Sequence, residues 1–149
     1  MTINIIPATA DDYPVLIKLW EASVRATHDF LAETHISTLR KQILDVYMPQ
    51  LPLWIATNEA GEALGFMGCY DGRVEMLFVS PQSRGAGVGK ALMQYAITEL
   101  SVNEVDVNEQ NPQAVGFYLY IGFEPVGRSE LDGEGNPFPL LHLRLRQHG

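Results

Sequence analysis

A glycine-rich turn between an apolar run and a helix-forming run is the feature that most constrains this chain. Residues 79–96 read VSPQSRGAGVGKALMQYA, with glycines at positions 85, 87 and 89 and a lysine directly after them. Because glycine has no Cβ, such a turn lets a ligand approach the backbone, and the next helix begins with free N–H groups and a positive dipole end. The pattern predicts a phosphate cradle, with a plain connecting turn as the alternative.

Spacing excludes two nucleotide-binding motifs. A P-loop requires Gly-x-x-x-x-Gly-Lys followed by Ser or Thr. If Gly89 and Lys90 formed its end, position 84 would have to be Gly and position 91 Ser or Thr, but the chain has Arg84 and Ala91 there. A dinucleotide fingerprint requires Gly-x-Gly-x-x-Gly between parallel strands. This turn is Gly-x-Gly-x-Gly, and it follows strand-like runs that are expected to pair as antiparallel strands. Arg84 adds a side chain that can bind a pyrophosphate through two hydrogen bonds without a metal.

Hydrophobic periodicity predicts one α/β domain over residues 1–149, with a mixed, mostly antiparallel sheet and the order β α α β β β α β α β β. A loop is expected at residues 27–35, between the first two helices. The Asp71-Gly72 pair predicts a tight hairpin. Strands are expected at residues 2–7, 53–57, 63–70, 73–79, 104–108, 123–131 and 138–145, and helices at about 11–26, 36–48, 90–100 and 111–122.

Composition narrows the class of partner. The net charge is −8. This charge disfavours binding to nucleic acid and to anionic membrane surfaces, and it favours cationic partners such as amines. Arg144 and Arg146 in the short basic tail are expected on the solvated face of an edge strand. The histidines show no metal-ligand spacing, so no metal is expected.

The single cysteine and the absence of targeting signals favour a soluble cytoplasmic protein. Cys69 has no disulfide partner in the chain and lies in a strand-like run, so a small core residue is expected there. No apolar run is long enough to span a membrane, and the N-terminal residues lack the basic and apolar regions of a signal peptide.

A second motif follows the glycine turn. Residues 111–123 read NPQAVGFYLYIGF. Together with V-x-P-x-x-R-G-x-G-V-G-x-x-L at residues 79–92, this resembles the GNAT superfamily of acetyl-CoA-dependent N-acetyltransferases, and several segments are similar to its small bacterial YjaB-type branch. The resemblance covers nearly the whole chain and implies a GNAT fold with a splayed central strand pair.

The resemblance implies where acetyl-CoA, the cosubstrate, is bound. The pantetheine arm would pair with the main chain of Leu77, Phe78 and Val79, which would also polarise the thioester carbonyl. Asn111 would contact the arm, cap the next helix, or do both. The CoA pyrophosphate would lie on the loop formed by Arg84, Gly85, Ala86, Gly87, Val88, Gly89 and Lys90.

Three residues are candidates for the acid and base chemistry. Tyr118 matches the tyrosine that protonates the leaving CoA thiolate, with aromatic packing as its alternative role. Glu75 is a candidate general base if it shares a strand face with Leu77, and its alternative role is an ion pair with Arg73. His28 matches a segment that lines the acceptor pocket, as a base, a substrate ligand or an ordinary hydrogen-bonding residue.

The expected activity is direct transfer of an acetyl group from acetyl-CoA to a primary amine. A non-catalytic acyl-CoA-binding module on the same fold is the competing class. Phe30 and Trp54 are expected to form walls of the acceptor pocket. The sequence leaves open whether the amine belongs to a small molecule or to a protein lysine or N-terminus, and exposed surfaces leave a homodimer open.

Overall fold

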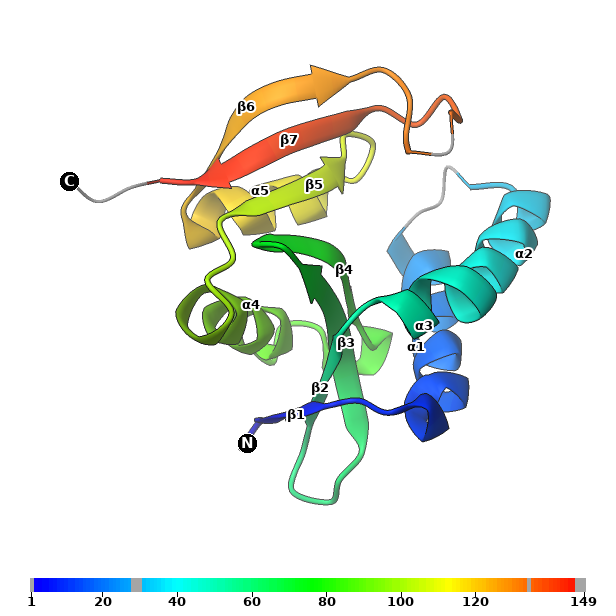
Figure 1. The fold of residues 1–149 in the computed structure, drawn as a ribbon, viewed down its shortest axis with the longest axis vertical. Helices are drawn as coiled ribbons and strands as arrows, with labels where there is room; N and C mark the ends of the chain where they lie inside the picture. Colours follow the sequence, from blue (N-terminus) through cyan, green and yellow to red (C-terminus); the bar gives the residue numbers. More distant parts are fainter. Residues whose placement is uncertain (1, 28–30, 134, 147–149) are drawn as a thin grey trace.

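Seven strands form one mixed sheet in the computed structural model, which describes residues 2–27, 31–133 and 135–146 (Figure 1). The strands are β1 (Asn4–Pro7), β2 (Leu53–Thr57), β3 (Ala63–Tyr70), β4 (Arg73–Val79), β5 (Glu104–Asn108), β6 (Phe123–Ser129) and β7 (Leu140–Leu145). Their order across the sheet is β1-β2-β3-β4-β5-β7-β6. Every neighbouring pair is antiparallel except β4 and β5, which are parallel.

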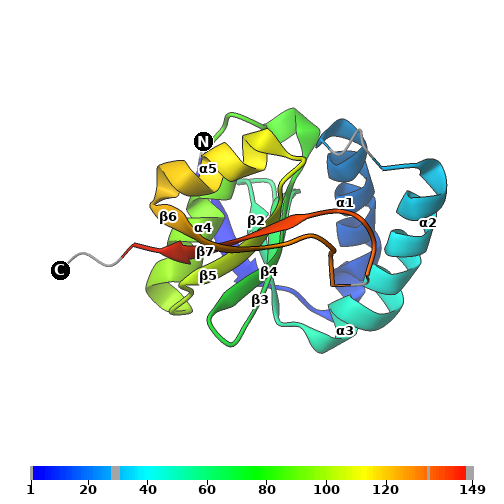
Figure 2. The same ribbon diagram turned by 90° about the horizontal axis from the view of Figure 1, so that it is seen from above.

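Helices cover both faces of this sheet. The helices are α1 (Tyr13–Thr27), α2 (Glu33–Gln42), α3 (Met48–Gln50), α4 (Val88–Glu99) and α5 (Pro112–Ile121). A π-helical turn over Ile43–Tyr47 joins α2 to α3, and short 3₁₀ turns cover Ala10–Asp12 and Pro81–Ser83. Figure 2 shows α4 and α5 on one side of the sheet and α1, α2 and α3 on the other.

The element order expected from the sequence is confirmed, with one error in the loop over residues 27–35. The first helix continues to Thr27, and α2 begins at Glu33, within the segment expected to be irregular. Ala32 precedes α2 without a side-chain cap. The residues that usually mark a helix start are therefore missing there, which is why the sequence did not reveal it.

The place of β7 in the sheet is a second correction. It pairs with β5 on one side and with β6 on the other, so it is an interior strand. Arg144 therefore does not lie on an edge strand, and its guanidinium is 3.3 Å from the Glu104 carboxylate on β5. The last strand inserts beside β5 because the connection after β6 folds back, a long-range choice that periodicity does not encode.

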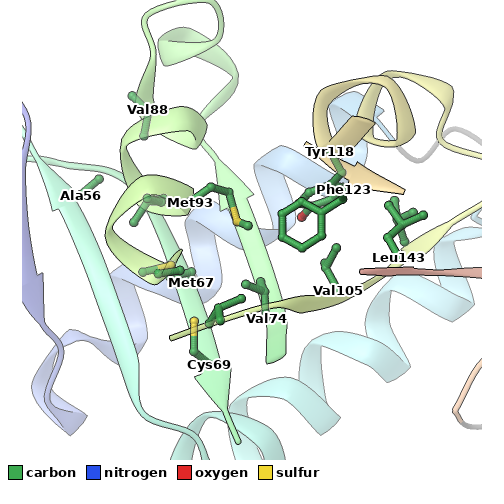
Figure 3. Packing of buried hydrophobic residues seen from close by; sticks show 14 of the residues in the cluster. Ala56, Met67, Cys69, Val74, Val88, Met93, Val105, Tyr118, Phe123 and Leu143 are labelled. Carbon is green, nitrogen blue, oxygen red and sulfur yellow. The ribbon is translucent and has the colours of Figure 1, made fainter. Parts of the chain in front are cut away.

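Two hydrophobic clusters hold the layers together. One lies between the sheet and the helices α4 and α5, and includes Tyr118, Phe123, Val105 and Leu143 (Figure 3). The other lies under α1 and α2. Cys69 is buried in the first cluster, as expected for a core residue. None of the helices in the described ranges is long and apolar enough to cross a membrane.

Candidate active site

The parallel strands β4 and β5 touch only at one end. They pair at Arg73 with Glu104 and at Val74 with Val105, and then diverge. The backbone of residues 77–79 pairs with β3 on its other side, and within the described residues β5 supplies it with no ladder partner. A cleft of about 730 Å³ opens at this divergence. The expected splayed strand pair is therefore present.

Residues from both halves of the chain line the cleft. They come from β4, the glycine loop, the start of α4, β5 and α5, with single contributions from α1, from the β6–β7 connection and from β7. The lining residues are Ser23, Glu75, Met76, Leu77, Phe78, Val79, Ser83, Arg84, Gly85, Gly87, Val88, Gly89, Lys90, Asp106, Val107, Asn108, Asn111, Gln113, Ala114, Phe117, Tyr118, Tyr120, Gly133 and Leu140.

The glycine loop forms an open cradle at one end of the cleft. Gly85 and Gly87 have φ angles of +78° and +83°, in the left-handed region that favours glycine, and Gly87 is the N-cap of α4. A Cβ added to either residue would meet no atom within 4 Å. The space above both residues is therefore free for a ligand, as the phosphate-cradle prediction requires.

Two cations border this cradle. Arg84 and Lys90 are both exposed and both line the cleft. Neither side chain forms an ion pair with another residue in the described part of the chain. Their charges are thus available to an anion that also receives the N–H groups at the start of α4.

Tyr118 lies where α5 faces the cleft, and it is buried with 6% of its surface exposed. Its ring packs edge-on against Phe117 and Phe123, with centroids 5.2 and 6.0 Å apart. Burial, with a smaller contribution from Cys69, raises the pKa of the Tyr118 hydroxyl well above its ordinary value. The hydroxyl therefore keeps its proton at neutral pH, which suits a proton donor.

Asn111 caps α5 and lines the cleft. Its side-chain oxygen accepts a hydrogen bond of 3.2 Å from the backbone N–H of Ala114, and Pro112 follows as the first helical residue. The side chain is buried, with 8% exposed. The capping role expected for Asn111 is thus observed, and the same residue borders the space expected to hold the pantetheine arm.

A bulge in β4 changes the position expected for Glu75. The pairing of β3 with β4 runs from Gly68 opposite Met76 to Cys69 opposite Val74, so Glu75 is the extra residue. Bulges occur next to active sites and re-aim side chains. Strict alternation, which would place Glu75 on the same face as Leu77, therefore fails at this residue.

The ion pairs show which way Glu75 points. One carboxylate oxygen of Glu75 lies 3.5 Å from Nε of Arg73, and the same guanidinium reaches Glu104 and Asp106 at 2.6 Å each. Leu77 instead packs into the cluster under α4. The pair with Arg73, which the sequence left open as the alternative role, is present, and Glu75 also lines the cleft.

The residues expected at the acceptor pocket are His28, Phe30 and Trp54. The residues 28–30, which contain His28 and Phe30, lie outside the described residues. Trp54 does not line the cleft. Its ring faces Tyr95 of α4 at 6.4 Å and packs against the cluster on that side of the sheet, because alternation in β2 turns Leu53 and Ile55 towards α1 instead.

Asp106 is a cleft residue that sequence reasoning missed. It lies on β5, where Val105 and Val107 are buried in the cluster below α4 and α5, so alternation turns Asp106 to the opposite face. The pattern EVDVN contains this alternation, but the splay beside β4 makes that face line a cleft. With Glu75, Asp106 gives the cleft an acidic end, in which both carboxylates also contact the guanidinium of Arg73.

Comparisons with known proteins agree with this geometry. The model of the acetyltransferase (GNAT) domain matches residues 19–142. The peptidyl-lysine N-acetyltransferase YjaB of Salmonella typhimurium is 43% identical over 143 residues, which are 96% of this chain and 98% of that protein. The solution structure of apo-form YjaB from Escherichia coli has a TM-score of 0.91 and 39% identity, covering 99% of this chain and 100% of that one.

A more distant structure shares the fold and holds coenzyme A. The PaiA N-acetyltransferase from Thermoplasma acidophilum, in complex with coenzyme A, has a TM-score of 0.74 at 18% identity and covers 98% of this chain and 100% of that one. The family uses acetyl-CoA as cosubstrate. The chain therefore belongs to the GNAT acetyltransferase family and is an N-acetyltransferase, an enzyme that transfers an acetyl group to an amine.

Proposed function

We propose that this enzyme acetylates lysine side chains of proteins, with acetyl-CoA bound across the splay of β4 and β5. The observation that carries the proposal is the charge arrangement of one continuous cleft. Arg84 and Lys90 border one end, and Glu75 and Asp106 line another part. A cleft of this kind suits an anionic cosubstrate and a cationic acceptor at the same time.

The cradle binds the pyrophosphate in this proposal. The N–H groups at the start of α4 and the side chains of Arg84 and Lys90 contact the phosphate oxygens, and the bare backbone at Gly85 and Gly87 allows close approach. The other residues predicted to contact the cofactor are Ala86 in the turn and Val88 and Gly89 in the first turn of α4. Asn111 borders the pantetheine arm while it caps α5.

The chemistry uses the free edge of β4 and the buried tyrosine. Backbone groups of Leu77, Phe78 and Val79 that have no partner on β5 pair with the arm and stabilise charge on the carbonyl oxygen. The amine nitrogen forms a bond to the acetyl carbon, the C–S bond breaks, and Tyr118 gives its proton to the sulfur. The nitrogen of the new amide releases its extra proton to water, and the Tyr118 phenolate takes up one proton from water, so the protons balance.

The acceptor must lose a proton before it attacks. A lysine ammonium has a pKa of about 10, so a base is needed near neutral pH. Glu75 is the base that the sequence predicts among the described residues, and His28, which lies outside them, remains a proposal. The acidic end of the cleft supports an ammonium, and the names of the YjaB relatives support a lysine within a protein. We expect the enzyme to work in the cytoplasm.

Calorimetric titration with acetyl-CoA, with CoA, ATP and NAD in parallel, tests the cradle. We expect binding of acetyl-CoA and CoA only, and its loss in Gly87→Trp, because the indole would fill the open space above residue 87. Gly87→Ala is the matched control, since it carries the same left-handed strain without the bulk. A preference for ATP or NAD would contradict the proposal.

The acceptor class is tested with three matched peptides. One carries a free lysine and a blocked N-terminus, one a free N-terminus and acetylated lysine, and one has both amines blocked. We expect CoA release only with the first. Equal activity on the second would move the proposal from lysines to protein N-termini.

A further inference from the structure

A chain of hydrogen bonds crosses three strands beside the cleft. Asp106 of β5 lies 2.7 Å from Nδ1 of His142 on β7, and Nε2 of the same imidazole lies 2.7 Å from the hydroxyl of Ser129 on β6. The His142 and Asp106 side chains are 35% and 29% exposed, and Ser129 is half-buried. Neither Ser129 nor His142 belongs to the sequence motifs that place acetyl-CoA.

The charges around this hydrogen-bond chain determine which atoms donate and which accept. The other carboxylate oxygen of Asp106 accepts a hydrogen bond of 2.6 Å from Arg73, in an ion pair in which Asp106 is the carboxylate. A carboxylate only accepts hydrogen bonds, so Nδ1 of His142 carries a proton and donates a hydrogen bond to Asp106. In a neutral ring Nε2 is then an acceptor, and the Ser129 hydroxyl donates to it.

One end of this hydrogen-bond chain lines the cleft, and the other end lies beside a residue that lines it. Asp106 lines it directly. Ser129 pairs across the β6–β7 ladder with Leu140, and Leu140 lines the cleft as well. Asp106 and His142 are the strand neighbours of Val105 and Leu143, which face the core on the α4 and α5 side of the sheet. The hydrogen-bond chain therefore lies on the opposite face, where Arg73 and Glu75 meet.

Other charged groups are connected to the same face. Arg73 and Glu75 come from β4, Glu104 comes from β5, and Arg144 comes from β7 itself. All of these are joined in carboxylate–guanidinium pairs. Imidazole is the side-chain type whose charge changes in that range, and it is the commonest general base in enzymes.

We propose that Ser129, His142 and Asp106 form a proton relay that takes the proton of the acceptor ammonium, as a second route beside Glu75. The inference rests on the proposed function, because it needs an ammonium at the acidic end of the cleft. Ser129 receives one proton from the ammonium while its own hydroxyl proton moves to Nε2 of His142. The products are a free amine and an imidazolium paired with Asp106, and the imidazolium returns the proton to solvent.

The rate of lysine-peptide acetylation as a function of pH tests the relay. His142→Gln, which fills similar space but cannot take up a proton, should lower kcat/KM about tenfold near pH 7. The loss should shrink towards pH 10, where more of the lysine is already a free amine. Ser129→Ala should change the profile in the same direction, while the affinity for acetyl-CoA stays unchanged in both variants.

A merely structural role predicts a different pattern. A variant that only loosens the sheet loses the same factor at every pH, and a profile of His142→Gln parallel to that of the parent overturns the relay. His35→Gln is the matched control, because His35 is an exposed histidine of α2 whose ring contacts Phe138 and has no bond to the relay. It should leave the profile unchanged.

Nitrogen-15 spectra of the His142 ring give a readout that needs no acceptor. We expect a protonated Nδ1 and a bare Nε2 in the neutral ring, and loss of this preference in Asp106→Asn. The opposite tautomer overturns the relay even if the enzyme acetylates lysine. A parent enzyme that shows the expected tautomer but acetylates no lysine peptide contradicts the proposed acceptor and, with it, the role of the relay in that reaction.

Discussion

Gly89 of α4 lies directly against the ring of Phe117 on α5. A Cβ added at Gly89 would lie 3.2 Å from Cζ and 3.4 Å from Cε1 of that ring. The contact joins the cradle to the helix that carries Tyr118, the next residue after Phe117. The third glycine of the loop therefore serves helix packing, whereas Gly85 and Gly87 leave open space for a ligand.

Replacement of Gly89 by alanine should weaken acetyl-CoA binding by about threefold to tenfold. The added Cβ forces the Phe117 ring to move, and Phe117 lines the cleft. Calorimetric titration measures the change. Gly116→Ala on α5 is the control, because its Cβ would meet no atom within 4 Å, and it should raise the free energy of unfolding by about 0.5–1 kcal/mol. Equal affinity in the two variants would contradict the packing role.

Tyr118→Phe should reduce kcat by about 100-fold and leave the affinity for acetyl-CoA unchanged. The variant keeps the ring that packs against Phe117 and Phe123 and removes only the hydroxyl proton. Steady-state kinetics with a lysine peptide and calorimetry with acetyl-CoA separate the two effects. An unchanged kcat would leave Tyr118 with packing alone.

Glu75→Gln should lower kcat/KM most strongly near neutral pH if Glu75 accepts the proton. The glutamine also breaks the contact with Arg73, so stability has to be followed separately by thermal unfolding. Glu109→Gln is the matched control, since Glu109 pairs with Arg128 and does not line the cleft. If kcat/KM of Glu75→Gln fell by the same factor at every pH, Glu75 would be an ion-pair partner of Arg73 and not the base.

Cys69 should make the fold less stable in alkaline solution. Burial raises the pKa of the Cys69 thiol from 9.0 to about 12. A folded-state pKa above the unfolded value gives a stability contribution that is complete below pH 9 and is lost as pH rises towards 12. The loss is at most about 1.4 kcal/mol per pH unit.

Denaturant unfolding between about pH 8 and pH 10.5 measures this effect. Cys69→Ala should show a shallower decline than the parent, although its smaller side chain lowers stability at every pH by a constant amount. Tyr118 acts with the same sign at higher pH, because burial raises its pKa as well. Parallel curves for the parent and Cys69→Ala would contradict the prediction.

The elements and the cradle were predictable because their signals are local. Alternation marks β2, β3, β4 and β5, the Asp71-Gly72 pair marks the hairpin, and Pro112 and Gly122 mark the ends of α5. The glycine loop and the motif that contains Asn111 and Tyr118 lie close along the chain. Both motifs line one cleft in the folded protein.

The start of α2 and the position of Glu75 were not predictable in the same way. The first lacks a capping side chain at Ala32, and the second depends on a bulge between β3 and β4. A bulge is set by how two strands pair, so the sequence of one strand does not reveal it. Strict alternation consequently placed Glu75 on the wrong face.

The sequence by itself determined the family, the order of elements, the cradle and the candidate proton donor, because each depends on residues close together along the chain. Only the tertiary structure decided that β7 enters between β5 and β6, and that insertion brings His142 to Asp106 and Ser129. The physical reason is register. Pairing between distant strands selects which polar side chains meet, and no short-range pattern records that choice.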